Sequence, residues 1–133
     1  MMFDLSVLIL RLFAGLGIVL FHGWGKIQGI FRFLSGGEWK FVDTVASIGF
    51  PIPGFFAILA GLTEFIGGMF LIVGFLTRIS AGFLSFVVIV AIYFHIRTST
   101  NFELPLIYLG MFLSLIFSGA GKFSIDSYML KRR

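Results

Sequence analysis

Long apolar stretches separated by short polar segments dominate this sequence. The stretches cover about residues 5–23, 53–75, 79–96 and 103–117. A helix rises ~1.5 Å per residue, so the first stretch, of about 19 residues, is just long enough to cross a hydrocarbon core of ~30 Å. The pattern therefore predicts four membrane-spanning helices.

The longest polar connection lies between the first two stretches. A Ser-Gly-Gly sequence at residues 35–37 breaks it, and residues 38–49 then carry an apolar residue at every third position. This spacing predicts an amphipathic helix that lies in the membrane interface. The other connections are short, so consecutive spans are antiparallel neighbours. We expect a single transmembrane domain over residues 1–133: an all-α, integral membrane, up-down four-helix bundle with an interfacial helix between spans one and two.

The composition agrees with a membrane protein. The mean hydropathy is +1.08, 59% of the residues are hydrophobic and only 12% are charged, which leaves too few polar residues to cover a water-soluble surface. The chain has no cysteine, which excludes disulfides, thiol relays and thiolate metal sites. The net charge of +4 resides in loops and in the basic tail, where anionic lipid headgroups are the expected partner. Nucleic acid is not an expected partner.

The flanks of the spans predict the orientation. Arg11 interrupts the first stretch, so we expect a retained helix rather than a cleaved signal peptide. An even number of spans puts both termini and the turn at Thr77 and Arg78 on one side. That side carries Arg78, Lys122, Lys131, Arg132 and Arg133, whereas the other carries Lys26, Arg32, Lys40 and Arg97. The excess favours cytoplasmic termini.

Ionisable residues inside apolar stretches are the first candidates for function, because charge is costly in lipid. By residue count, Arg11 lies ~10 Å from one edge of its span and Glu64 lies ~15 Å from the opposite edge of its own. These depths predict an ion pair between Arg11 and Glu64. A pair that only fixes the packing of the two spans explains both residues equally well.

A second cluster of polar residues lies near the opposite edge of the membrane. His22, His95 and Glu103 end or begin spans there, with Lys26 and Tyr108 close in depth. Arg11, Gly15, His22 and Lys26 form one stripe on the first helix, which should face inward, and small residues at Gly61 and Gly68 predict close helix contacts beside Glu64. The ligand-binding candidates are Arg11, His22, Lys26, Glu64, His95, Glu103 and Tyr108. No catalytic residue can be assigned and no metal site is predicted.

The histidines allow other interpretations. Hydrogen bonds to water or to lipid headgroups explain interfacial histidines more simply than metal or haem ligation does. His22 and His95 lie on parallel, diagonal spans of the predicted bundle, so they could flank a haem. Haem ligation is therefore the less favoured interpretation.

Several motifs follow one another in the order found in a known family. They are Ile9-Leu10-Arg11-Leu12, His22-Gly23 with Lys26, Ser47-Ile48-Gly49-Phe50-Pro51 with Pro53, Ala60 to Glu64 with Gly67-Gly68, Gly74-Phe75-Leu76-Thr77-Arg78, and Gly119-Ala120-Gly121-Lys122-Phe123-Ser124-Ile125-Asp126. The sequence resembles the DoxX family over nearly its whole length. It departs from the family pattern at Ala120, Lys122 and Phe123, where proline, arginine and tyrosine are common.

The resemblance implies a four-helix inner-membrane protein of a bacterium or archaeon, linked to respiration or redox stress. Namesake relatives are associated with a thiosulfate:quinone oxidoreductase. We expect a membrane subunit of a redox system with a site for a quinone-like or other small lipophilic ligand, acting with a soluble or membrane oxidoreductase subunit or as a homo-oligomer rather than as a self-sufficient enzyme. The alternatives are a non-enzymatic membrane anchor for a soluble oxidoreductase and, less favoured, a small proton or solute carrier.

Overall fold

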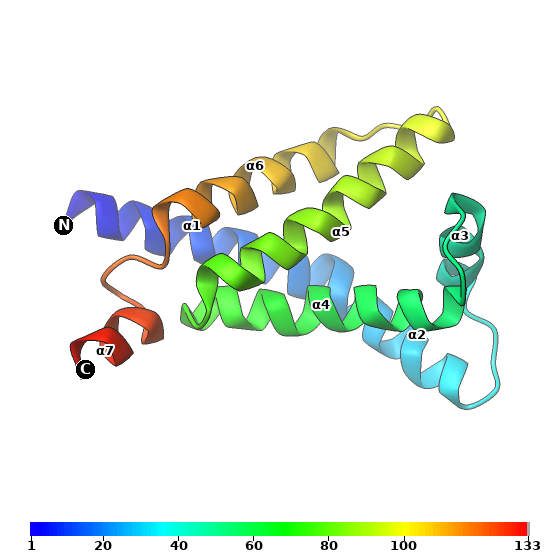
Figure 1. The fold of residues 1–133 in the computed structure, drawn as a ribbon, viewed down its shortest axis with the longest axis horizontal. Helices are drawn as coiled ribbons and strands as arrows, with labels where there is room; N and C mark the ends of the chain where they lie inside the picture. Colours follow the sequence, from blue (N-terminus) through cyan, green and yellow to red (C-terminus); the bar gives the residue numbers. More distant parts are fainter. Residues whose placement is uncertain (133) are drawn as a thin grey trace.

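The computed structural model describes residues 1–132, and every regular element in this range is helical, as predicted (Figure 1). The elements are α1 (Met2–Ile18), a π-helical turn η1 (Val19–Gly23), α2 (Trp24–Leu34), α3 (Lys40–Ile48), α4 (Pro53–Val73), α5 (Thr77–Arg97), α6 (Glu103–Ser118) and α7 (Ile125–Lys131). Helix α3 lies within the range 38–49 predicted for the amphipathic segment, and Figure 1 shows it running across the end of α4.

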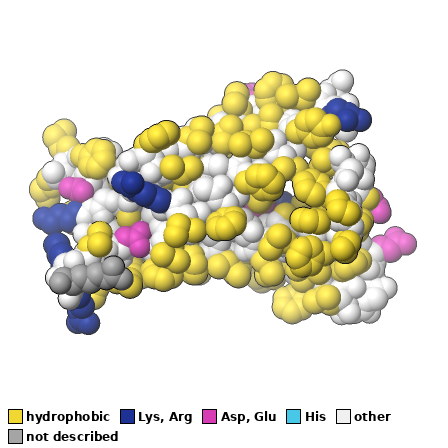
Figure 2. Space-filling view, viewed as in Figure 1, with side chains coloured by type: hydrophobic (Ala, Val, Ile, Leu, Met, Phe, Trp, Pro, Cys, Tyr) yellow, Lys and Arg dark blue, Asp and Glu magenta, His cyan; other side chains and the backbone are white. Residues whose placement is uncertain are grey.

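Among the described residues, three helical runs are long and apolar enough to cross a membrane: Met2–Leu34, Pro53–Val73 and Thr77–Arg97. Helix α6 is apolar but has 16 residues, which is about 24 Å of helix and short of a ~30 Å core. Figure 2 shows hydrophobic side chains over most of the visible face, with basic side chains mainly at the end that holds the termini. A membrane protein with several apolar helices is thus established.

The first helix is longer than predicted. The prediction ended it near residue 23, but α1, η1 and α2 form one continuous run to Leu34. Residues 24–34 are more polar than the preceding stretch, yet they contain no proline and the first strong break is the Ser-Gly-Gly sequence that follows. Polarity therefore marked the edge of the apolar stretch and not the end of the helix.

The helices α1, α4, α5 and α6 pack in a closed order, with α1 against α4, α4 against α5, α5 against α6 and α6 against α1. Ala14, Leu71, Leu84, Phe112 and Leu115 form the centre of the core and are fully buried. Small residues allow the closest approach: a Cβ added to Gly15 would lie 2.8 Å from the carbonyl oxygen of Gly68. The predicted close contact at Gly68 is therefore confirmed.

The C-terminal segment closes the end of the molecule that holds both termini (Figure 1). The two carboxylate oxygens of Asp126 accept hydrogen bonds from the backbone N–H groups of Leu76 and Thr77, at 2.8 and 2.9 Å. The N–H of Asp126 donates to the carbonyl oxygen of Gly74 at 2.9 Å. Asp126 thereby caps the first turn of α5 from a distant part of the chain.

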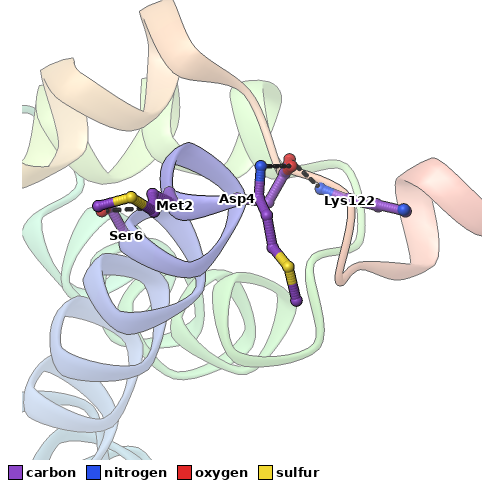
Figure 3. Close-up of polar contacts among 5 residues, drawn as sticks. Met2, Asp4, Ser6 and Lys122 are labelled. Carbon is purple, nitrogen blue, oxygen red and sulfur yellow. Dashed lines mark hydrogen bonds and ion pairs between the residues drawn. The ribbon is translucent and has the colours of Figure 1, made fainter.

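Two further contacts hold this segment. The Nη2 of Arg11 donates to the carbonyl oxygen of Phe123, and the Oδ1 of Asp4 accepts from the backbone N–H of Lys122 at 2.9 Å (Figure 3). Gly74 has φ +73°, and a Cβ there would collide with Nη1 of Arg11. We call this arrangement of Arg11, the α4–α5 turn and residues 119–126 the terminal clamp.

Candidate functional site

A cavity of about 490 Å³ lies at the end of the molecule opposite the terminal clamp. One face each of α4 and α5 forms two of its walls, α3 forms a third, and the junction of η1 and α2 contributes polar side chains. Most of the lining is apolar and aromatic. The exceptions among the candidate residues are His22, Lys26, Glu64 and His95, which all line this one cavity. We call it the α3–α5 cavity.

The central polar contact of the cavity is an ion pair between Lys26 and Glu64. Lys26 Nζ lies 2.6 Å from Glu64 Oε2. The glutamate is only 6% exposed, and the lysine side chain is 19% exposed. Lys26 Nζ also lies 4.9 Å from the ring centroid of Phe41 on α3. A buried charge is stable only when it is paired, so the contact with Lys26 accounts for the burial of the glutamate.

The predicted ion pair between Arg11 and Glu64 is wrong. Arg11 is fully buried in the terminal clamp, where it bonds to a backbone carbonyl. The reason is the register of the antiparallel helices: Gly15 lies against Gly68, and Gly23 lies against Phe65 and the carbonyl carbon of Glu64. Glu64 is therefore level with the end of η1, one turn before Lys26, whereas Arg11 is level with Gly74.

His22 lies in the π-helical turn. Such turns insert one extra residue into a helix and often occur at functional sites. The imidazole meets the ring of Tyr108 edge to face, with centroids 5.4 Å apart. Its Nε2 is shielded from solvent and forms no hydrogen bond with any group in residues 1–132. The turn thus presents a buried polar atom that still has a hydrogen bond to make.

His95 reaches the same cavity from the C-terminal end of α5. Its Nδ1 lies 2.7 Å from the hydroxyl of Thr100, in the link that follows the helix. This contact fixes one ring nitrogen, so it restricts the orientation of the imidazole at the cavity wall. The two histidines therefore occupy different walls, one on the first helical run and one on the third.

The remaining candidates lie outside the lining of the cavity. Tyr108 is 7% exposed and stands behind His22, stacked on Phe112. Glu103 is exposed at the start of α6, where its N–H bonds to the side chain of Asn101. Arg11 belongs to the opposite end. The predicted stripe on the first helix faces inward, but it is divided between two sites.

The structure adds residues that the sequence did not single out. Phe41, Thr44 and Thr63 line the α3–α5 cavity, and Asp126 organises the terminal clamp. The spacing of apolar residues in 38–49 already predicted the apolar face of α3. It did not indicate which other helix that face packs against. Within residues 1–132, no group of three or more His, Cys, Asp or Glu side chains is placed to hold a metal ion.

Comparison with known proteins identifies the family. The DoxX family profile matches residues 6–97, a range that includes the terminal-clamp arginine and all four polar cavity residues named above. The chain belongs to the DoxX family. The inner membrane protein YqjF of Escherichia coli K12 is 33% identical over 135 residues, covering 97% of this chain and 95% of the E. coli protein.

A second relative is an uncharacterised protein of Haemophilus influenzae, 30% identical over 122 residues, with 85% of this chain and 83% of the relative covered. No solved structure matches. The family profile ends before Glu103, Tyr108 and the closing Gly119–Asp126 motif, while the alignment with YqjF covers so much of the chain that it includes them. These comparisons establish a DoxX-family membrane protein.

Proposed function

We propose that this DoxX protein is the membrane subunit of a redox system and binds a quinone-like or similar small lipophilic molecule in the α3–α5 cavity. One observation carries the proposal: an apolar cavity of about 490 Å³ is lined by a buried Lys26–Glu64 pair and by His22, whose buried Nε2 has no partner among the described residues. Ligand sites are typically ~300–1,000 Å³ and apolar, with a few polar groups that orient the ligand. Lysine and histidine can donate hydrogen bonds to the carbonyl oxygens of a quinone.

The rim of the cavity suits a ligand that arrives from the bilayer. Leu59 on α4 and Phe83 and Phe86 on α5 line the cavity and are also exposed on the apolar surface of the molecule. A lipophilic tail could therefore remain in contact with lipid while the head reaches Lys26. Electrons would come from a partner oxidoreductase, since the chain has no cysteine for a thiol relay.

Binding of a short-chain quinone analogue tests the proposal. Trp39 lies against Phe41, a lining residue, with ring centroids 5.4 Å apart, so a bound quinone should quench tryptophan fluorescence. His22→Phe keeps a ring against Tyr108 but removes the donor. We expect it to weaken binding about tenfold, the effect of losing one hydrogen bond of about 1.4 kcal/mol.

Glu103→Gln is the matched control, because Glu103 is exposed and does not line the cavity. Equal affinities for the two variants, or no saturable quenching in the unmodified protein, would refute the quinone site. If the protein binds no quinone but co-purifies with a soluble oxidoreductase, the membrane-anchor function would replace it.

We also propose that α6 is the fourth span and that both termini face the cytoplasm. The packing of α6 between α5 and α1 supports a crossing, and Figure 1 places both termini and the α4–α5 turn at one end. Arg78, Lys122, Lys131 and Arg132 lie in or beside that end. A reporter fused to the C-terminus should be active only in the cytoplasm, and activity on the other side would reverse the orientation.

A further inference from the structure

A second cavity, of about 560 Å³, lies beside the terminal clamp and is separate from the α3–α5 cavity. The α4–α5 turn and the start of α5 form one wall, Gly119–Gly121 forms another, and α7 forms the third. This position is the junction of two apolar helices, where the hydrocarbon of a bilayer gives way to headgroups. We call it the clamp cavity.

Two polar groups of the lining have no partner in the described protein. Thr77 is 1% exposed, and its Oγ1 makes no hydrogen bond within residues 1–132. The guanidinium of Arg78 lies along the backbone of Gly119, where an added Cβ would come within 3.1 Å of Nε. No carboxylate of the described residues lies within ion-pair distance of Arg78. The lining thus contains an unpartnered hydroxyl, which is closed off from solvent, next to a cation without a carboxylate partner.

The acidic groups at this end are already engaged. Asp126 lines the clamp cavity, but both its oxygens accept N–H groups from the first turn of α5. Asp4 accepts the N–H of Lys122 and lies 3.8 Å from the N-terminal amine (Figure 3). Basic side chains gather at the same end of the molecule (Figure 2). The surroundings of the cavity therefore favour an anion.

The other walls are apolar. Phe75, Leu76 and Ile79 contribute from the α4–α5 side, and Met129 and Leu130 contribute from α7. Leu76, Ile79 and Leu130 are exposed at the edge of the membrane helices. A free inorganic ion would leave these walls uncovered, whereas a lipid would place its phosphate at Arg78 and its first methylenes against the apolar wall.

We propose that the clamp cavity binds the phosphate of an anionic bilayer phospholipid, with Arg78 supplying the charge and Thr77 Oγ1 a hydrogen bond. The bound lipid then lies over α7, next to the terminal clamp. This site is independent of the proposed quinone site, because the two cavities share no lining residue.

Native mass spectrometry of the delipidated full-length protein tests the site by titration with phosphatidylglycerol. Arg78→Gln should weaken the first binding event about tenfold, since a charge-assisted hydrogen bond is lost. Arg97→Gln is the matched control, because Arg97 is also exposed but lies at the opposite end and bonds to the hydroxyl of Tyr93 at 2.8 Å. Phosphatidylcholine, which has no net charge, should bind more weakly than phosphatidylglycerol to the unmodified protein.

A second variant protects the test against misfolding. Thr77→Val keeps the volume of the side chain and removes only the hydroxyl, so it should fold and still weaken binding severalfold. Equal losses in Arg78→Gln and Arg97→Gln, or unchanged binding in Thr77→Val, would overturn the proposal. Displacement of the lipid by millimolar inorganic phosphate would also overturn it, since the site would then recognise phosphate without the lipid.

Discussion

The two ends of this molecule place their polar residues in opposite ways. At the terminal clamp, Asp126 and Arg11 bond to backbone groups of distant segments and hold the chain closed. At the α3–α5 cavity, Lys26 and Glu64 bond to each other, and His22 keeps a free nitrogen. Charged side chains therefore tie distant segments to one another at one end, and at the other end they pair between two helices beside a histidine that lacks a partner.

Removal of Lys26 should have the largest effect on stability. Lys26→Met leaves the carboxylate of Glu64 buried without its cation, so we expect a loss of about 3–5 kcal/mol in unfolding free energy. The double variant Lys26→Met/Glu64→Gln should recover most of that loss. Thermal unfolding in detergent measures both. If the double variant is no more stable than the single one, the pair does not account for the burial of Glu64.

Gly74→Ala probes the terminal clamp directly. The left-handed φ and the collision with Arg11 should together cost about 2–4 kcal/mol. Gly82→Ala is a suitable control, because Gly82 lies inside α5 with no atom near an added Cβ. We expect the melting temperature to fall sharply for Gly74→Ala and to stay level or rise for Gly82→Ala. Similar melting temperatures for the two variants would mean that the terminal clamp can accommodate the added methyl group without strain.

Asp126→Ala should weaken the clamp by about 1–2 kcal/mol, the usual cost of losing a helix N-cap. Asp43→Ala, in an exposed first turn of α3, should change stability by less than about 0.5 kcal/mol. Limited proteolysis offers a second readout, because α7 should be cut faster once its anchor is lost. Equal cleavage of both variants would argue against a structural role for Asp126.

The smallest effect on stability is expected for Tyr108, which lies behind the α3–α5 cavity. Tyr108→Phe keeps the ring packed between His22 and Phe112, so stability should change by less than about 0.5 kcal/mol. Tyr108→Leu removes the aromatic contacts and should cost about 0.5–1.5 kcal/mol in addition to lost packing. Unfolding curves distinguish the two. A large loss in Tyr108→Phe would show that the hydroxyl, not the ring, is the important group.

The sequence predicted the helices well, because apolar length is a local property. Helices α4, α5 and α6 begin and end close to the predicted boundaries. It also indicated that His22, Lys26 and His95 lie near one level, and the structure places them on one cavity. Depth along a helix can be counted from a sequence, so this part of the prediction rested on firm geometry.

The partner of a polar side chain could not be predicted by counting residues in this way. The prediction paired Glu64 with Arg11, but the contacts of Gly15 and Gly23 with α4, which a sequence does not contain, place it beside Lys26. Asp126 stands 50 residues from the N–H of Leu76 that it caps. Such a contact depends on how the last segment folds back, and no periodic pattern specifies it.

The π-helical turn decides which face of the first helix meets the cavity. Rewinding the turn as regular α-helix with every residue kept would rotate everything after it by roughly 100° relative to α1, because the turn holds one extra residue. Lys26 would then point away from Glu64, although every side chain of both helices was retained. A relative that lacks one residue here would form a plain α-helix with the same face towards the cavity, so this turn is a place inside a membrane helix where related proteins can differ in length.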